Sequence, residues 1–254
     1  MTVLIIAATT LRELARSRLF YNLLVFALLL IVGSLVLASL TIGQWERVIT
    51  DTGLATIHAA GTLIAVLVGI SLVAGEMERR TLYVILAKPV GRFTFMLGRY
   101  LGLAVALAIN VFVMGLAVVL LLKGTRYEVV QAFWPALFLV YVELLVLSAF
   151  ALVFSSFSSV TLSAIFTFGV FLIGHLSADL RFFGSRSPSA VGRAFSEIVY
   201  RALPNLELLN LKAQAANALP VTAGAVASAA AYGLAYAAAA LCVAGVIFQR
   251  RDLR

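Results

Sequence analysis

The chain has 254 residues, of which 63% are hydrophobic and only 12% are charged. Soluble domains are typically about 45–50% apolar and about 25% charged. The composition therefore excludes an ordinary soluble globular protein, a disordered chain and a nucleic-acid-binding domain. In so apolar a chain, the net charge of +8 is best explained by basic loops that face a membrane surface.

The N-terminal segment, residues 3–19, has apolar residues at helical spacing with polar residues on the opposite side. The apolar positions are Leu4, Ala7, Ala8, Leu11, Leu14 and Ala15, and the polar ones are Thr9, Arg12, Glu13 and Arg16. This pattern predicts an amphipathic elbow helix that lies in the headgroup region. The alternative is a simple cytoplasmic extension of the first membrane span.

Six stretches are long and apolar enough to cross about 30 Å of hydrocarbon, which takes roughly 20 residues. They cover residues 20–43, 55–75, 95–122, 132–154, 160–179 and 219–248. The fifth is short and carries Ser163, Thr167 and Ser177, so a tilted or partly re-entrant helix is expected there. The sequence predicts an all-α polytopic membrane protein with six transmembrane helices and a single permease-like domain over residues 1–254.

Lys and Arg gather in the N-terminal segment, in the loop between the second and third spans, and in the C-terminal tail. An even number of spans puts these three segments on one side, and the positive-inside rule makes that side cytoplasmic. Both termini are therefore expected in the cytoplasm. The long loop between the fifth and sixth spans is basic too, but charge in long loops orients a chain less strongly.

The cytoplasmic loop over residues 76–92 has the pattern of a short amphipathic helix. Glu76 and Glu78 precede Arg79 and Arg80, which suits a helix N-terminus, and Pro89 ends the apolar stripe that follows. Such a helix offers a soluble partner an apolar side and charges that fix its orientation. The alternative is a solvated turn whose charges only follow the positive-inside rule.

The long outer loop over residues 181–218 predicts short amphipathic helices before the last span. Glu197 lies four residues from both Arg193 and Arg201 and can pair with either. Pro204-Asn205 breaks the chain between two apolar-rich pieces. These pieces are expected to lie in the outer leaflet or to cap a cavity, or to be surface helices without a role in transport.

The cytoplasmic loop also carries a family resemblance. Glu76-x-Glu78-Arg79-Arg80-Thr81-Leu82, Leu86-x-Lys88-Pro89-Val90-x-Arg92 and Gly98-Arg99 resemble the loop of type 2 ABC exporter permeases. The family usually has Gly where this chain has Arg80. Leu203-Pro204-Asn205-Leu206-Glu207 is similar to the subgroup that includes permeases for copper-enzyme maturation.

The resemblance implies the membrane subunit of an exporter in a bacterial-type cytoplasmic (inner) membrane. It implies a second permease subunit, as a homodimer or heterodimer, and two separate ATP-binding subunits that carry ATP and Mg²⁺. This chain has no GxxxxGK[ST] phosphate loop, so neither ATPase activity nor a cofactor is expected on it. Accessory proteins and the substrate stay open. The residues implied to couple to the ATPase are Glu76, Glu78, Arg79, Arg80, Thr81, Leu82, Leu86, Pro89 and Arg92.

Ionisable residues within the apolar stretches are candidates for function because a charge there is costly to insert. Glu143 lies mid-way along the fourth span and is interpreted as lining a cavity, holding a proton or accepting an interhelical hydrogen bond, with Asn110 as one partner. His175 and Asp179 share a helix face, a spacing that can ligate a metal or form a charge pair, but two ligands without a third are weak evidence for a metal. His58 is expected at the outer interface, and no metal site is predicted.

Two other classes of function remain open from the residues alone. One is an ion-coupled secondary transporter or channel in which Glu143 couples ion movement to transport. The other is a membrane-embedded enzyme that uses His175, Asp179 and Glu143. Only an ABC permease needs the segment 76–92 for activity.

Overall fold

The computed structural model describes residues 2–72, 91–186 and 189–250, and in these ranges the chain is helical with no strand. Six of the helices are long and apolar enough to span a membrane. They are α2 (Arg18–Ser39), α3 (Trp45–Ser71), α6 (Arg92–Gly124), α7 (Phe133–Ser155), α8 (Val160–Ser185) and α11 (Ala223–Arg250). The shorter helices are α1 (Thr2–Leu14), α9 (Ala190–Ala202), the 3-10 turn η1 (Leu206–Leu209) and α10 (Lys212–Ala216).

The α7 helix forms the centre of the bundle. It is apolar on all sides, and 78% of its most apolar stretch is buried. A helix of this kind must be surrounded by other helices or by lipid, and α7 packs against α3, α6, α8 and α11. By contrast, only 22% of the most apolar stretch of α2 and 28% of that of α8 are buried. These two helices therefore present apolar faces to lipid or to another subunit.

The helix α3 begins at Trp45, ten residues before the expected start of the second span. The stretch from Glu46 to Asp51 is polar and was therefore excluded from the apolar run, but it continues the same helix beyond the apolar part. The extra three turns place His58 well inside α3 rather than near its end. The expectation that His58 is interfacial is therefore wrong.

The N-terminal helix α1 packs along the first part of α6. A Cβ atom on Gly102 would lie 2.7 Å from the carbonyl oxygen of Ala7, so only glycine allows this close approach. Ile6 lies against Gly98 one turn earlier, while Leu4 is exposed. The face that contacts α6 thus differs in part from the apolar stripe expected from the sequence.

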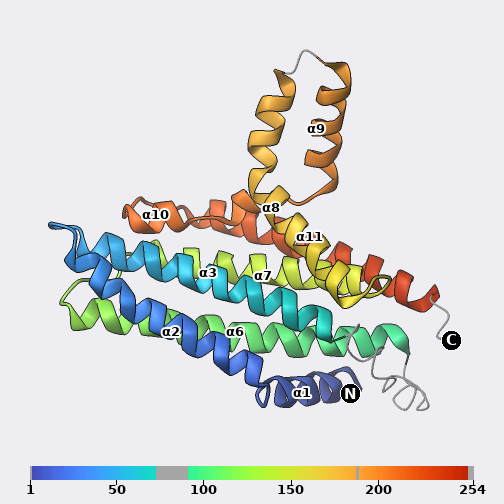
Figure 1. Ribbon diagram of the computed structural model, residues 1–254, viewed down its shortest axis with the longest axis horizontal. Helices are drawn as coiled ribbons and strands as arrows, with labels where there is room; N and C mark the ends of the chain where they lie inside the picture. The colour runs from blue at the N-terminus through green and yellow to red at the C-terminus, as the bar shows by residue number, and fades with distance from the viewer. Residues whose placement is uncertain (1, 73–90, 187–188, 251–254) are drawn as a thin grey trace.

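The helix α8 runs past the expected end of the fifth span, and its last turns stand out from the bundle side by side with α9 (Figure 1). Glu197 on α9 pairs with Arg201, as expected, and also with Arg181 of α8 at 3.3 Å. The hydrogen bond from Arg201 is the main reason that the pKa of Glu197 is lowered. The Arg181–Glu197 pair joins α9 to α8, whereas the Arg201–Glu197 pair lies within α9.

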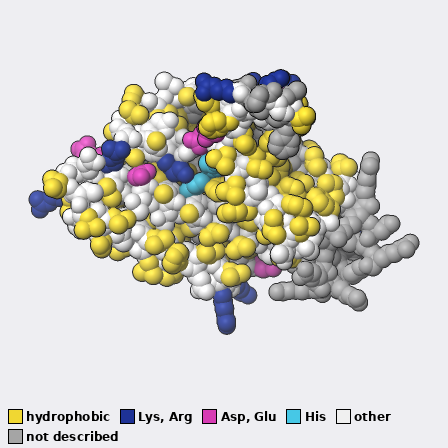
Figure 2. All heavy atoms as spheres, turned by 45° about the horizontal axis from the view of Figure 1, so that its top comes forward, with side chains coloured by type: hydrophobic (Ala, Val, Ile, Leu, Met, Phe, Trp, Pro, Cys, Tyr) yellow, Lys and Arg dark blue, Asp and Glu magenta, His cyan; other side chains and the backbone are white. Residues whose placement is uncertain are grey.

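The two ends of the bundle differ in what they carry. The N-terminus, the C-terminus, the end of α3 and the start of α6 lie at one end, and the α2–α3 turn and α10 lie at the other (Figure 1). Figure 2 shows that hydrophobic side chains cover the middle of one face, while charged side chains gather mostly towards its edges. This distribution suits a protein surrounded by hydrocarbon.

Candidate functional site

The residues predicted to contact an ATPase are described only in part. All of them except Arg92 fall within 73–90, outside the described residues. Arg92 begins α6, and its Nη1 donates to the carbonyl oxygens of Phe248 and Gln249 at 3.3 Å. These carbonyls belong to the last turn of α11, where helix carbonyls lack partners within the helix and a positive charge is favourable. Arg92 thus joins the start of α6 to the end of α11.

An ion pair between Arg99 and Glu13 holds α1 to the same end of α6. Arg99 is buried, and its Nη1 donates to the Glu13 carboxylate of α1. Its guanidinium also lies 5.4 Å from the ring of Phe95. The first two turns of α6 are therefore in contact with both α1 and α11, next to the undescribed loop.

Glu143 is the most deeply buried carboxylate among the described residues, with 1% of its surface exposed. Its Oε1 is 2.8 Å from Nε2 of His58, which lies on the neighbouring helix α3. An isolated carboxylate in so apolar a place is costly unless it is hydrogen-bonded or paired. The His58 imidazole supplies this partner, instead of the Asn110 amide that the sequence suggested.

His175 of α8 completes a group of three side chains from three helices. Its Nε2 is 3.6 Å from Glu143 Oε1, and its ring centroid is 5.4 Å from that of His58. Its Nδ1 is 3.2 Å from the carbonyl oxygen of Phe171 in the same helix. Asp179, one turn further on, is exposed and makes no ion pair within the described part of the chain, so the charge pair that its spacing from His175 allowed is not present.

Lys212 of α10 is the fourth ionisable side chain of the group. Its Nζ lies 2.9 Å from Nδ1 of His58, on the opposite side of the ring from Glu143. Burial lowers the pKa of Lys212, and the nearby carboxylates of Glu143, Glu207 and Asp51 oppose that shift only in part. The polar chain Lys212–His58–Glu143–His175 thus connects α10, α3, α7 and α8, and it is called the polar cluster below.

The segment before α10 is held in place by contacts with two helices. A Cβ atom on Gly174 would lie 2.6 Å from Leu206 Cγ, so α8 and η1 touch directly beside His175. The Asn205 side chain accepts a hydrogen bond from the Glu207 amide, and the Asn205 amide donates to the Tyr232 hydroxyl of α11. These contacts fix the position of the segment that carries Lys212.

Asn110 of α6 is buried, but neither its amide nitrogen nor its amide oxygen has a hydrogen-bond partner among the described residues. A buried amide without a partner costs free energy. It is not part of the polar cluster, and nothing in the structure shows it lining a cavity.

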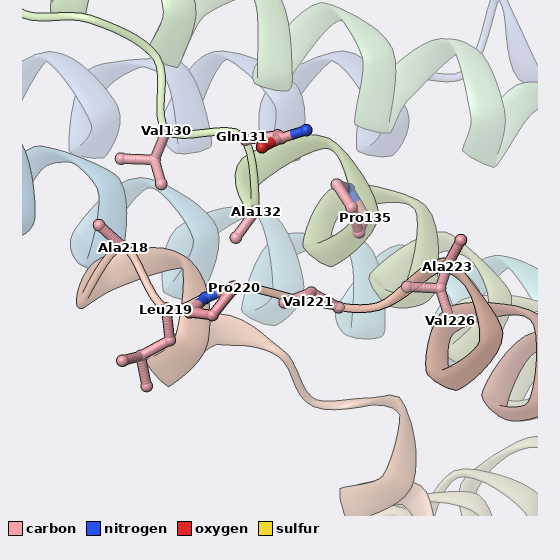
Figure 3. Close-up of a pocket in the computed structure, with 10 residues that line it drawn as sticks. All are labelled: Val130, Gln131, Ala132, Pro135, Ala218, Leu219, Pro220, Val221, Ala223 and Val226. Atoms are coloured by element: carbon pink, nitrogen blue, oxygen red, sulfur yellow. The ribbon is translucent and has the colours of Figure 1, made fainter.

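Among the hollows of the described structure, one lies near the polar cluster and another lies at the end of the bundle. An apolar groove of about 510 Å³ separates α3 from α8, and it is lined by Thr62 and Leu172, each about one turn from a cluster histidine. A pocket of about 400 Å³ lies between residues 130–135 and 218–226 (Figure 3). Gln131 is its only side chain with a polar group, so it offers little chemistry, whereas the groove lies within about one helical turn of the two cluster histidines.

A family model described as "ABC-2 family transporter protein" matches residues 4–253, nearly the whole chain. The chain belongs to this family. No curated protein matches it significantly. The family match together with six apolar helices makes the chain the membrane subunit of an ABC transporter. The match does not separate subgroups, so the likeness to copper-enzyme-maturation permeases stays a prediction.

In this ABC-2 family transporter, sequence reasoning found Glu143 but not the side chains that surround it. The apolar run of the second span begins at residue 55, which puts His58 near its outer end, whereas α3 begins at Trp45. No motif in the sequence marks Lys212. The available indication was that Lys212 is the one charged residue between Leu208 and the C-terminal end of the last span. A lone lysine in an apolar segment calls for a buried or interfacial partner.

Proposed function

We propose that this ABC-2 family transporter is the permease half of an exporter, and that two permease subunits and two ATP-binding subunits form the working assembly. The observation that carries the proposal is the family match over residues 4–253 on a six-span helical bundle. The sparsely buried helices α2 and α8 offer apolar surface for a second permease subunit. Members of this family are membrane subunits that are normally not catalytic, so ATP and Mg²⁺ would bind the partner.

We further propose that residues 76–92 form the coupling segment that an ATP-binding subunit grips. Two observations support this role, one on the adjoining helix α6 and one on the segment itself. Arg92 and Arg99 connect the start of α6 to α11 and α1, so a displacement of the segment would be passed to three helices at once. The pattern of acidic residues before basic ones in 76–80 suits a short helix that fits a groove.

The proposed orientation places both termini and the coupling segment on the cytoplasmic side of the inner membrane. The basic character of those segments supports it, as does the position of the starts of α1 and α6 and the end of α11 at one end of the bundle (Figure 1). In this orientation α1 serves as the elbow helix at the cytoplasmic interface. α10 would then lie at the outer end, and the α8–α9 hairpin stands out from the middle of the bundle (Figure 1).

The decisive experiment is co-purification with candidate ATP-binding subunits in a mild detergent. Wild type should recover the ATPase in stoichiometric amounts, and a variant with residues 76–92 replaced by a Gly/Ser linker should recover much less. A matched control replaces residues 186–190 between α8 and α9 with the same kind of linker, which should leave recovery unchanged. A well-folded chain that recruits no ATPase would refute the proposal.

An ion-coupled transporter is the second candidate, because Glu143 lies in a buried polar cluster of a kind that ion pathways use. The two functions differ in which change abolishes transport. If the ABC proposal holds, Glu143→Gln leaves transport dependent on ATP, and the linker replacement of 76–92 abolishes it. The opposite result, with transport that tolerates the linker and follows an ion gradient, would favour the second candidate.

A further inference from the structure

We propose that His58, Glu143 and His175 bind one divalent transition-metal cation, of the class of Zn²⁺, inside the helical bundle. One ligand atom from each of the three side chains lies within 4.8 Å of the others. The three come from α3, α7 and α8, so an ion held between them would link three helices. The proposal concerns the chain itself and does not depend on the direction or the energy source of transport.

The donor set and its spacing suit such an ion. Two imidazoles and one carboxylate are a common zinc donor set, with metal–ligand distances of about 2.0–2.2 Å, which puts neighbouring ligand atoms about 3.4 Å apart. The Glu143 oxygen is 2.8 Å from the His58 nitrogen and 3.6 Å from the His175 nitrogen. To hold the ion, the first distance must open by about 0.6 Å, and the separation of the two histidine ligand atoms, which is at most 4.8 Å, must also come to about 3.4 Å.

The hydrogen bonding of His175 is that of a typical metal-ligating histidine. Its Nδ1 donates to the Phe171 carbonyl, so in the neutral ring Nε2 carries a lone pair. That nitrogen is buried without a hydrogen-bond partner, and it faces a carboxylate oxygen that also carries lone pairs. Two acceptors that face each other repel, and a cation or a proton between them removes the repulsion. Donation from the other ring nitrogen to a backbone carbonyl is the usual second contact of a ligating histidine.

Lys212 is the group that an arriving cation must displace. Its Nζ faces Nδ1 of His58, and carboxylates of Glu207 and Asp51 are close enough to attract it. When the ion binds, the His58 proton shifts from Nε2 to Nδ1, and the ammonium moves towards these carboxylates. No proton is lost from the ring in this exchange. A neutral acceptor in place of Lys212 would remove the repulsion and accept the Nδ1 proton.

The ion has a route to the site. His175 is 20% exposed, and Figure 2 shows imidazole atoms at the surface beside basic and acidic side chains. The apolar groove between α3 and α8 begins about one turn away. His58 and Glu143 are buried while His175 is partly exposed, so a bound ion could exchange past His175.

Metal titration of the purified full-length chain tests the proposal. The background is Cys242→Ala with an affinity tag that contains no histidine, because Cys242 is exposed and is an alternative ligand. After removal of bound metal with a chelator, Zn²⁺ should bind at one equivalent per chain, and Co²⁺ should give the visible absorption of a site with nitrogen and oxygen ligands. Bound Zn²⁺ should also raise the melting temperature.

Three variants separate a metal site from a purely structural network. Glu143→Gln and His175→Gln should each weaken Zn²⁺ binding at least tenfold, and Lys212→Gln should tighten it about tenfold. Asp179→Asn is the matched control, because Asp179 lies on the same helix outside the cluster and should have no effect. His175→Gln keeps the test valid if the buried Glu143 variant fails to fold.

Two outcomes would overturn the proposal. One is a folded chain that takes up no Zn²⁺ or Co²⁺ after chelator treatment, which would mean that the cluster is held by protons and hydrogen bonds alone. The other is uptake that is unchanged in a His58→Gln and His175→Gln double variant. Because neither readout involves an ATPase or transport, failure here leaves the permease proposal untouched, and failure of the co-purification leaves the metal site untouched.

Discussion

Glu143 is a buried carboxylate that the fold surrounds with three ionisable side chains. His58 lies at hydrogen-bond distance, His175 lies slightly further, and Lys212 adds positive charge behind His58. Breaking a buried pair by removing one partner is costly because it leaves the other without compensation. The cluster therefore contributes to the stability of the bundle as well as to any chemistry within it.

At the residue scale we predict that Glu143→Leu destabilises the metal-free protein far more than Glu143→Gln does. The leucine leaves the buried His58 Nε2 without an acceptor and Lys212 without the nearby Glu143 charge, at a cost of about 3–5 kcal/mol, whereas the glutamine oxygen still accepts from His58. Thermal unfolding in detergent with chelator present measures the difference. Equal stability of the two variants would mean that the carboxylate is not a packing partner of His58.

Two tyrosines form reciprocal bonds between α6 and α7. The Tyr100 hydroxyl of α6 donates to the Leu145 carbonyl, and the Tyr141 hydroxyl of α7 donates to the Ala104 carbonyl. We predict that Tyr100→Phe and Tyr141→Phe each lower stability by about 0.5–1 kcal/mol, as expected for one interhelical hydrogen bond in a membrane. Tyr21→Phe on the exposed face of α2 is the control and should change nothing. Effects no larger than the control would contradict the assignment.

At the scale of elements, the contact between α1 and α6 depends on the small size of Gly102. We predict that Gly102→Leu separates α1 from α6, because the new side chain meets the backbone of Ala7. The rate of tryptic cleavage between Arg12 and Arg18 should then rise. Gly33→Leu is the matched control, since a side chain at Gly33 meets nothing within 4 Å in the described structure. Unchanged cleavage in Gly102→Leu would show that α1 is held by other contacts.

The hairpin of α8 and α9 depends on the charge of Glu197. Its pKa is lowered in the folded chain, so the ion pairs stabilise the hairpin above the ordinary pKa of about 4.3 and are lost as the pH falls through the lowered value. We predict that spin labels at Leu180 and Ile198 move apart on acidification. In Glu197→Gln the separation should be larger at neutral pH and independent of pH. A pH response that persists in this variant would assign it to another group.

At the scale of the whole molecule, the position of the chain ends predicts the topology. In a Cys242→Ala background, Gly43→Cys and Asn217→Cys should react with a membrane-impermeant thiol reagent from outside intact cells. Arg16→Cys should react only after the membrane is opened. Both outer positions are exposed and lie at the end of the bundle opposite the N-terminus (Figure 1). The reverse labelling pattern would invert the proposed orientation and place residues 76–92 out of reach of an ATPase.

The sequence by itself determined the fold class, and it placed four of the six spans to within four residues at both ends. Apolar length and periodicity are local properties, and a membrane helix needs little else because lipid solvates it along its whole length. The short motifs of residues 76–99 were enough to indicate the ABC-2 family, to which the chain belongs. The roles of the coupling residues stay predictions because 73–90 lie outside the described chain.

Only the tertiary structure decided which side chains meet. His58, Glu143, His175 and Lys212 are far apart in sequence, and no periodicity relates them. Their contact depends on three features of the packing. The helix α3 begins at Trp45, α8 continues to Ser185, and Gly174 packs against Leu206. The helical spacing of His175 and Asp179 allowed a local pair, but in the packed bundle His175 faces Glu143 and Asp179 is exposed. Local patterns set which helices form, whereas the partner of a buried charge is set by how the helices pack.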